Sequence, residues 1–450
     1  MDHDKSSTTP LSHDEFSALM AEALEGVRLP EGALVAAGVS GGADSMALTL
    51  LLDRWCRAKG YNLVALTVDH GLRAASSQEA RQVSSWLGGR KIRHKILSWQ
   101  GRKPSASLQE NARRARYQLM GEWAAGQGVS LLCLAHHQED QAETFLLRLA
   151  RGSGVDGLSA MKPLMEYPLI GAYPDPHRLP RLCRPLLDIP RERLRATLRV
   201  QHQDWIEDPS NEDRRHARVR VRQFLQHPEI DGLTPRRLAD TARRMGQVQK
   251  LLNELMHEVM TTAVRIDPLG YVTVDREAIR AAHREIVVRL LAVLVREVGG
   301  KDYGPRFEKI EKLYEALHDP DFKGQTIGGC VVRPGQGSAR KHKPVVVCRE
   351  VAAVNDVAEL QPGQALLWDG RFRIYSPRIG GQVVVMGVAR WHELCHKTPD
   401  LKTRWTAPPE AVVSLPCLID RDGVERVPHL ATQATGQDVQ MEFVRFWNKT

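Results

Sequence analysis

The sequence lacks several features that would assign it to a structural class at once. Its seven cysteines lie far apart, and no two of them have the Cys-x-x-Cys spacing. This argues against a disulfide framework, a zinc ribbon or a metal-cluster site, and it favours a reducing compartment. No apolar run approaches the roughly 20 residues of a membrane-spanning helix, so we expect no membrane partner. Residues 1–16 lack the basic and apolar regions of a signal peptide, and we therefore expect a cytoplasmic protein.

The sequence also has fewer acidic than basic residues. The chain carries 63 Lys and Arg against 54 Asp and Glu, which gives a net charge of +9 over 450 residues. A basic balance favours a polyanionic partner, and nucleic acid is the commonest one. A generally basic surface is the alternative. The length leaves room for about three domains.

The most informative stretch is a short polar segment between two apolar runs. Residues 33–39 are typical of a buried parallel strand, whereas the longer run that begins at Met46 is typical of a helix packed on a sheet. Between them lie Ser40, Gly41, Gly42, Ala43, Asp44 and Ser45. Glycines let backbone N–H groups approach a ligand, and a helix N-terminus carries unpaired donors, so this segment predicts a phosphate-binding loop. Because Asp44 would repel a bare phosphate, we expect it to bind Mg²⁺ held on the phosphates.

Further apolar runs alternate with helical patterns through the first half of the chain. The runs at 63–69, 92–97 and 129–135 each predict a buried strand. Strands that alternate with helices at this spacing predict an α/β fold with a doubly wound parallel sheet. Ligands of such sheets bind at the carboxyl ends of the strands. Ser40, Asp69 and His136 all fall at such ends.

The second half of the chain changes character twice. Apolar residues at three- and four-residue steps predict long packed helices from about residue 232 to 320. Short runs rich in valine and aromatic residues follow from 326 to 450 and predict a small α+β, mostly β domain. We therefore expect a catalytic domain over 13–226, a helical domain over 232–320 and a β-rich domain over 326–450.

A dense group of titratable residues follows the run 129–135 directly. It consists of His136, His137, Glu139, Asp140 and Glu143. Carboxylates and imidazoles can hold an ammonium group and transfer protons. A polar helix start, with acidic residues favoured by the helix dipole, is one alternative. A metal site is another, although no His-Glu-x-x-His spacing supports it.

Two other patterns are less specific. Gly152, Gly154 and Gly157 form a Gly-x-Gly-x-x-Gly spacing, but it follows a helical pattern where a dinucleotide site requires a strand. The arginines from Arg214 to Arg222 could contact nucleic-acid phosphates. A solvated helix face is the alternative for them.

Several short segments together resemble one known family. In order they are SGGADS (40–45), VDHGLR (68–73), NARRARY (111–117), AHHQEDQAET (135–144), RGSGVDGLSAM (151–161), RPLL (184–187) and DPSN (208–211). The set is similar to the tRNA(Ile)-lysidine synthases, which belong to the PP-loop ATP pyrophosphatase superfamily. The likeness covers roughly residues 35–222 well and the rest more loosely.

The resemblance implies a fold and an activity. The fold is that of the PP-loop ATPases, also called adenine nucleotide α-hydrolase-like. Such enzymes use ATP, with Mg²⁺, to adenylate the first anticodon cytidine of a tRNA(Ile) with a CAU anticodon. L-lysine then displaces AMP and leaves lysidine in the tRNA. The resemblance leaves a homodimer open as one alternative for the assembly.

The resemblance also implies roles for particular residues. Ser40 to Ser45 would hold the phosphates, with Asp44 on Mg²⁺, and Asp69 and His70 would border the adenosine. The catalytic candidates are Asp44, Arg113, His136, Glu139 and Asp140. The family pattern is usually HHxDDQ, and Glu139 stands here in place of its first Asp, so we give Asp140 more weight. Arg113 and Arg116 are candidates for contacts with the substrate base or backbone, and a solvated helix face is their alternative.

Three rival interpretations remain open at this point. A tRNA thiolase of the same superfamily would commonly need paired cysteines, which the sequence lacks. A synthetase of the amidotransferase type would need a glutaminase segment with an N-terminal cysteine nucleophile, and none is visible. A non-catalytic RNA-binding module would not need Asp44, His136 and Asp140.

Overall fold

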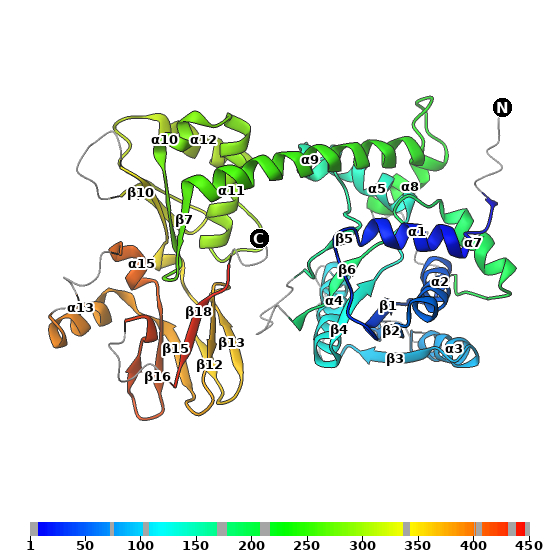
Figure 1. The fold of residues 1–450 in the computed structure, drawn as a ribbon, viewed down its shortest axis with the longest axis horizontal. Coiled ribbons are helices and arrows are strands. Elements are labelled where there is room, and N and C mark those ends of the chain that lie inside the picture. The colour runs from blue at the N-terminus through cyan, green and yellow to red at the C-terminus, as the bar shows by residue number, and fades with distance from the viewer. Residues whose placement is uncertain are drawn as a thin grey trace. The chain divides into compact units, whose positions relative to one another are not determined.

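The computed structural model describes residues 8–72, 76–101, 108–168, 178–207, 217–335, 343–399, 401, 407–430 and 438–445. The chain divides into two compact units (Figure 1). Unit 1 comprises residues 1–171 and 176–250, and unit 2 comprises residues 172–175 and 251–450. No helix in the described part of the chain combines the length and the apolar character needed to cross a membrane.

Unit 1 is organised around a six-stranded sheet with the order β3-β2-β1-β4-β6-β5. All neighbouring strands pair in parallel except β5, which runs antiparallel to β6. The strands are β1 (Leu34–Gly38), β2 (Asn62–Asp69), β3 (Arg93–Ser98), β4 (Val129–Cys133), β5 (Leu164–Met165) and β6 (Arg181–Cys183). Because the strand order reverses between β1 and β4, their carboxyl ends form the switch point at which doubly wound sheets bind ligands.

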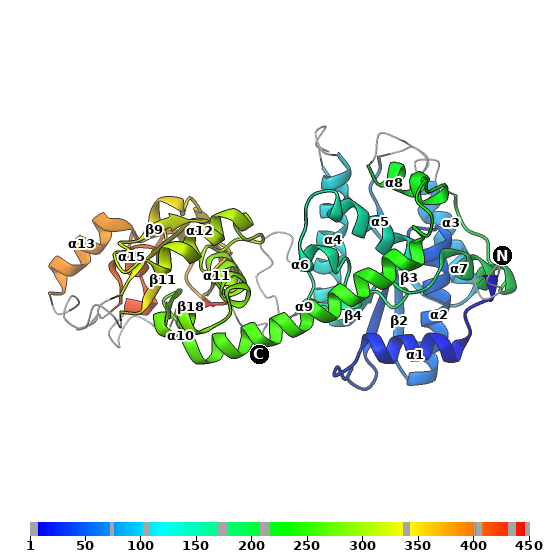
Figure 2. The same cartoon turned by 90° about the horizontal axis from the view of Figure 1, so that it is seen from above.

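Helices cover both faces of this sheet. One core contains α1, α2, α3 and α7, and the core on the opposite face contains α4. The helices of unit 1 are α1 (His13–Ala23), α2 (Ala43–Lys59), α3 (Ser76–Gly89), α4 (Leu108–Gln127), α5 (Gln138–Leu149), α6 (Val155–Leu158), α7 (Arg191–Val200) and α8 (Ala217–Gln226). Figure 2 shows α5 and α8 side by side, and these two helices pack together. The long helix α9 (Pro235–Ala263) begins in unit 1 and ends in unit 2.

The position of β1 at the centre of the sheet explains why residues 33–39 form one apolar run. Val35 and Ala37 of β1 face the core that contains α2, whereas Ala36 faces the core that contains α4. Since successive side chains of a strand point to opposite faces, a strand covered on both faces must be apolar at every position. Met46 and Leu52 of α2 are fully buried on this sheet. The strand–loop–helix pattern that sequence predicts at 33–55 is thereby confirmed.

Unit 2 has one larger antiparallel sheet and two smaller ones, and all three contribute to one large hydrophobic core. The five-stranded sheet has the order β7-β8-β11-β10-β9, with β7 (Val264–Asp267), β8 (Tyr271–Val274), β9 (Gln325–Ile327), β10 (Cys330–Pro334) and β11 (Val345–Arg349). Its helices are α10 (Arg276–Ala281), α11 (Arg284–Val298) and α12 (Phe307–His318). Leu290, Leu291 and Leu294 of α11 are fully buried in the shared core.

The two smaller sheets occupy the rest of unit 2. One contains β12 (Ala358–Leu360), β15 (Gly381–Val385), β16 (Pro416–Asp420) and β17 (Glu425–Arg426). The other contains β13 (Ala365–Trp368), β14 (Phe372–Tyr375) and β18 (Gln440–Phe443), and the helices are α13 (Gly387–Lys397) and α15 (Pro409–Val413). The fold class expected from the sequence, a doubly wound sheet followed by helical and β-rich parts, is confirmed.

The structure differs from the expectation in one detail of the helical region. Residues 264–267 and 271–274 form β7 and β8, although the sequence predicts helices from 232 to 320. The two strands form a hairpin around Gly270, whose φ of +79° suits a glycine in a tight turn. β8 pairs with β11, so the sheet takes strands from both sides of residues 320–326. The division into three domains stays a prediction.

Candidate active site

The phosphate-binding segment lies between β1 and α2. Gly42 is the N-cap of α2, with Ala43 as the first helical residue. The Ser40 backbone N–H donates a hydrogen bond to Ser45 Oγ over 3.1 Å, and Ser45 Oγ donates to the Gly42 carbonyl over 3.0 Å. These two bonds fold the segment back on the start of the helix. The backbone N–H groups of the first helical turn have no carbonyl acceptor within a helix. They therefore lie at the tip of this loop.

Gly41 has a backbone conformation and surroundings that exclude a side chain. Its φ is +89°, and a Cβ atom would lie 2.8 Å from Ile206 Cδ1 and 2.9 Å from Val83 Cγ2. The Ile206 backbone N–H also donates to the Gly41 carbonyl over 2.9 Å. The glycine is thus required both by its left-handed conformation and by close packing.

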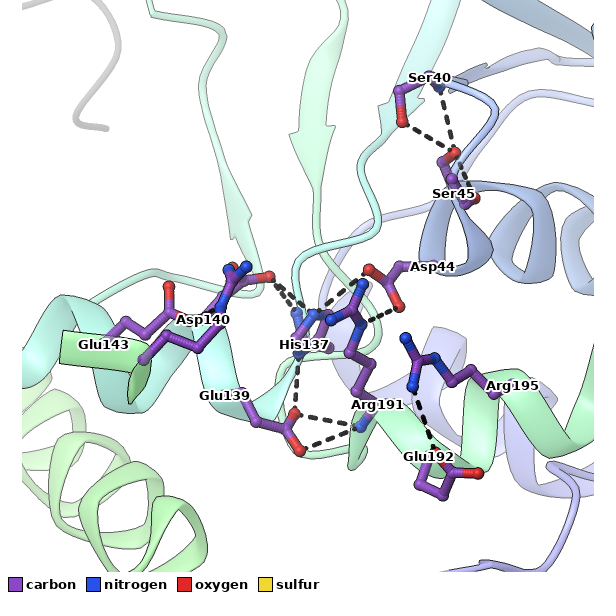
Figure 3. Close-up of polar contacts among 12 residues, drawn as sticks. Ser40, Asp44, Ser45, His137, Glu139, Asp140, Glu143, Arg191, Glu192 and Arg195 are labelled. Carbon is purple, nitrogen blue, oxygen red and sulfur yellow. Dashed lines mark hydrogen bonds and ion pairs between the residues drawn. The ribbon is translucent and has the colours of Figure 1, made fainter. Parts of the chain in front are cut away.

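Asp44 projects from the first turn of α2 towards two cations (Figure 3). Its Oδ1 lies 3.3 Å from Arg191 Nε, and its Oδ2 lies 3.5 Å from His137 Nε2. Burial alone raises the pKa of the Asp44 carboxyl, but the hydrogen bond and charge of His137 and the charge of Arg191 outweigh burial and leave the pKa below its usual value. Asp44 is therefore ionised at neutral pH.

His137 lies at the centre of the predicted acidic cluster. Its Nδ1 is 2.9 Å from Glu139 Oε2, and its Nε2 is 3.4 Å from Asp140 Oδ2 and 3.5 Å from Asp44 Oδ2. Burial favours the neutral ring, yet the charges of these carboxylates and their hydrogen bonds raise the pKa of His137 to about 10. His137 is thus a buried cation that joins the phosphate-binding loop to the start of α5.

The N-terminus of α7 completes this group. The Arg191 backbone N–H donates to Glu139 Oε2 over 3.1 Å, while the Arg191 side chain pairs with Asp44. Pro190 precedes it as the N-cap. Arg191 is a site residue that the sequence patterns above do not predict. The only local signal was its place beside a proline at a helix start.

Glu143 is held by two arginines of α8. Its side chain is 1% exposed and accepts hydrogen bonds from Arg218 Nε over 2.8 Å and Arg222 Nε over 2.7 Å. Arg218 Nη2 also lies 3.5 Å from Asp140 Oδ1. These two arginines of the predicted phosphate-contacting run are thus engaged by carboxylates within unit 1. Arg214 and Arg215 lie outside the described residues.

His136 has surroundings opposite to those of its neighbour in sequence. Arg184 Nε donates a hydrogen bond to His136 Nδ1 over 3.2 Å. Burial lowers the pKa of His136 to about 3, with a further decrease from the charges of Arg184, Arg218 and Arg113 and an opposing effect from Asp140. His136 is therefore neutral at physiological pH. Arg184 is the second site residue that residue-by-residue sequence reasoning missed, although it lies in the RPLL segment.

The other predicted residues form a separate group at the end of β2. The Asp69 carboxylate accepts hydrogen bonds from the Gly71 N–H and from the hydroxyls of Ser76 and Ser77. His70 Nε2 accepts a hydrogen bond from the Arg116 guanidinium. Its ring lies edge-on to Trp99, with the ring centroids 5.9 Å apart. This group lies at the carboxyl edge of the sheet, one strand away from Ser40.

Arg113 belongs to neither group by direct contact in the described part of the chain. Its guanidinium lies 5.1 Å from the centre of the Tyr117 ring, on the same helix, and its Nη2 donates weakly to Tyr117 Oη over 3.5 Å. Its charge nevertheless reaches His136. Of the predicted catalytic residues, the structure brings Asp44, Glu139 and Asp140 together around His137, places His136 beside them and leaves Arg113 on the polar face of α4.

The residues of the phosphate-binding loop suit a nucleoside triphosphate better than a metal ion bound by protein side chains alone. The loop offers backbone N–H groups, hydroxyls and a glycine too crowded for a side chain. Among the described residues, no three His, Cys, Asp or Glu side chains are arranged to hold a metal ion. Asp44 alone fits the usual mode of Mg²⁺, which takes one or two carboxylates and the rest of its ligands from phosphates and water.

Comparison with known proteins agrees with this geometry. The family described as "PP-loop domain" matches residues 13–229. A tRNA(Ile)-lysidine synthase of Ruegeria pomeroyi is 38% identical over 354 residues, which cover 78% of this chain and 79% of the relative. The chain belongs to the tRNA(Ile)-lysidine synthase family.

Two further tRNA(Ile)-lysidine synthases show the same relationship. That of Wolbachia pipientis is 31% identical and covers 85% of each chain. That of a Bradyrhizobium species is 38% identical and covers 71% of this chain and 89% of the relative. The matches span most of the chain, and the site residues described above all lie in the matched PP-loop domain. The family resemblance that the sequence segments indicate is confirmed.

Proposed function

We propose that this chain ligates L-lysine to the 2-position of the first anticodon cytidine of a tRNA(Ile) with a CAU anticodon, at the expense of ATP. The products are lysidine in the tRNA, AMP and pyrophosphate. The observation that carries the proposal is the ion-pair group around His137. It joins Asp44 of the phosphate-binding loop to Glu139 and Asp140 of the acidic cluster. A single site could therefore both activate the cytidine with ATP and bind the ammonium group of lysine.

The first step forms a bond between the cytosine 2-carbonyl oxygen and the α-phosphorus of ATP, and it breaks the bond to the β-phosphate. Ser40, Gly41, Gly42, Ala43 and Ser45 would hold the phosphates through backbone N–H groups and hydroxyls. Asp44 would hold Mg²⁺, which neutralises phosphate charge when bound. The residues Asp69 and His70, at the end of the next strand, would border the adenosine. Arg113, on the polar face of α4, would contact the substrate base.

In the second step the lysine ε-nitrogen attacks C2 of the adenylated base, and AMP leaves with the former carbonyl oxygen. The amine arrives as an ammonium ion and must lose a proton before it attacks. Asp140 and Glu139 are the carboxylates placed to hold it. Asp140 is the stronger candidate because its pKa is lowered, against the effect of burial, by His137 and Arg218. It is therefore ionised when the ammonium ion arrives.

Three further features support a tRNA substrate and a reaction in the cytoplasm. The net charge of +9 favours a polyanion. The cysteines include no disulfide. Unit 2 is large enough to contact a second part of the tRNA. A homodimer stays one of two alternatives for the assembly, which sedimentation of the purified chain would decide.

The cysteines make the thiolase alternative weaker than the ligase proposal. All seven are buried and unpaired. Burial raises the pKa of Cys56, Cys330 and Cys348 to about 12. Because the thiolate is the reactive form, such thiols are poor nucleophiles and poor sulfur carriers.

The test measures transfer of radiolabelled lysine to an unmodified tRNA(Ile) with a CAU anticodon, together with AMP release. We expect both with the native chain. An Asp44→Ala variant should lose about 10²–10³-fold in turnover, as expected when a group that stabilises transition-state charge is removed. Asp53→Ala, on the same helix but paired with Arg57, is the matched control and should keep full activity.

The other outcomes discriminate between the alternatives. AMP release without lysine transfer would keep the adenylating chemistry and contradict the proposed nucleophile, with sulfur the first replacement to test. Absence of any tRNA-dependent AMP release would contradict the enzyme interpretation and favour an RNA-binding module.

A further inference from the structure

Arg184 makes contacts that determine where the proton of His136 lies. Its side chain is buried, and its Nε–H points at His136 Nδ1 over 3.2 Å. A guanidinium has five N–H donors and no acceptor. The nitrogen that receives its hydrogen bond must therefore offer a lone pair and cannot carry a proton. In a neutral imidazole the proton then lies on Nε2.

The surroundings of His136 keep the ring in this neutral state. The charges that act on the ring are those of Asp140 on α5, Arg113 on α4, Arg218 on α8, and Arg184 after β6. Three of these four groups are cations. A second proton on Nδ1 would also face the Arg184 N–H directly, which removes the hydrogen bond and adds repulsion.

We propose that Arg184 holds His136 as the Nε2–H tautomer, so that His136 donates a hydrogen bond to an oxygen of the bound substrate and does not act as the base for lysine. The inference rests on the proposed function and deepens it. Nε2 is the one ring nitrogen left to reach a substrate, and it carries a proton. The proton of the lysine ammonium must therefore go to another group.

Arg184 is itself held in place by residues 162–165, at the start of β5. Its Nη1 donates to the Lys162 carbonyl over 3.1 Å and lies 3.3 Å from Met165 Sδ, and its backbone N–H donates to the Pro163 carbonyl over 2.7 Å. Gln141 of α5 pairs with the backbone of Met161 in both directions. The guanidinium is thus fixed from two sides. Arg184 acts through His136 and is a positioning residue.

The tautomer can be read directly from the nitrogen spectrum of the ring. A long-range ¹H–¹⁵N correlation on ¹⁵N-histidine-labelled protein separates protonated from unprotonated ring nitrogens. The signals of His136 are assigned by their loss in a His136→Gln variant. We expect an unprotonated Nδ1 and a protonated Nε2 in the free native chain. In Arg184→Met the ring should take up its second proton at a higher pH, and Arg184→Lys should restore part of the native behaviour.

Substitution of His136 separates a donor from a base. Glutamine places an amide N–H₂ near the position of Nε2, whereas asparagine places its amide near Nδ1, and neither can act as a base. We expect His136→Gln to keep turnover within about 10-fold of native and His136→Asn to lose about 10²–10³-fold, the usual effect of removing one donor to developing charge. Arg181→Met is the matched control, since Arg181 lies on β6 and pairs only weakly with Glu166 over 3.4 Å.

Each result decides a separate statement. A protonated Nδ1 in the native chain, or a ring spectrum unchanged in Arg184→Met, would overturn the role of Arg184. Equal losses in His136→Gln and His136→Asn would overturn the donor role, even where lysine transfer by the native chain supports the proposed function. If the native chain transfers no lysine, the proposed function fails, while the ring spectrum still decides the tautomer. Unfolding temperatures equal to native exclude misfolding as the cause.

Discussion

Each unit contains a group of ion-paired side chains, and the two groups differ in how far they are exposed to solvent. In unit 2, Asp369 accepts hydrogen bonds from Arg349 over 2.7 and 2.9 Å and from Arg371 Nε over 2.6 Å. The two arginine side chains are 2% and 0% exposed. Further donors of these arginines bind the carbonyls of Gly329, Ala353 and Ser414. Arg371 Nη1 has no hydrogen-bond partner among the described residues. The group is sealed from water and joins strands to loops.

The group in unit 1 keeps several of its charges within reach of a ligand, although His137 and Glu143 are buried. Asp44 is 23% exposed, Glu139 and Arg191 are each 32% exposed, and Arg218 is 38% exposed. Carboxylates and cations are equal in number around His137 and Glu143, and each carboxylate has at least one cationic partner. A bound ammonium ion or Mg²⁺ must therefore compete with a cation already present. The candidate site therefore differs from the structural group of unit 2 in that several of its charged side chains are exposed.

The largest expected effect breaks the sealed group. Asp369→Asn keeps the size of the side chain and tolerates the local φ of +49°, but it leaves two buried guanidinium groups without a carboxylate. We expect a loss of about 3–5 kcal/mol in the free energy of unfolding, as for other broken buried ion pairs. The free energy of unfolding is measured by urea titration, with hydrogen exchange of amides in unit 2 as the probe.

The control for this variant is Asp422→Asn, at an exposed turn of the same unit. It should change the free energy of unfolding by less than about 0.5 kcal/mol. A similar small change in Asp369→Asn would mean that the buried group contributes little, and the contrast between the two units would disappear.

A smaller effect is expected where the open group is changed. Asp140→Asn removes a charge that we propose holds the lysine ammonium. We expect lysine-dependent turnover to fall about 10- to 100-fold, from the loss of a charge-assisted hydrogen bond of about 1.5–3 kcal/mol, while tRNA-dependent pyrophosphate release falls less. Rates of both steps, measured over a range of lysine concentrations, give the comparison. Equal losses in the two steps would count against a lysine-holding role.

A further effect, spread over a range of pH, concerns a buried histidine of unit 2. Burial lowers the pKa of His429 to about 4, and its Nδ1 has no hydrogen-bond partner within the described residues. An unfolded histidine titrates near 6.5, so between these values the unfolded chain binds more protons. Unit 2 should therefore lose up to about 1.4 kcal/mol of stability per pH unit as the pH falls from about 6.5 towards 4.

Replacement of this histidine tests the assignment. His429→Phe should flatten the decline in unfolding free energy between pH 6.5 and 4, whereas His396→Phe, at an exposed position of the same unit, should leave it unchanged. The measurement is urea unfolding at several pH values. An unchanged slope in His429→Phe would assign the pH dependence to other groups.

The sequence predicts those parts of the fold and site that depend on neighbours along the chain. The strand before Ser40, the glycine-rich loop and the polar start of α5 each have a local pattern, and each is found where expected. The partners of these residues depend on the tertiary fold. Arg191 lies 147 positions from Asp44, and Arg184 lies 48 positions from His136. Residue type and spacing cannot distinguish these arginines from the many others in the chain.

The strands β7 and β8 show a second limit. Each has four residues and follows a 29-residue helix, so a window long enough to detect helical periodicity averages them away. β8 is stabilised as a strand by its pairing with β11, which is far along the chain, and β7 by its pairing with β8. The run Arg214 to Arg222 shows a third limit. The sequence shows the run itself, but it does not show that Glu143 and Asp140 pair with two of its arginines.

The contact between Gly41 and Ile206 has a consequence for synthesis on the ribosome. The loop is shaped in part by the Ile206 side chain and by the hydrogen bond from its N–H. During translation the chain emerges from its N-terminus, so the loop segment leaves the ribosome long before Ile206 does. A nascent chain that ends earlier has the loop sequence without the packing that gives the loop its shape. Competence to bind nucleotide should therefore arise only when nearly all of unit 1 has emerged, so truncated translation products would not consume ATP.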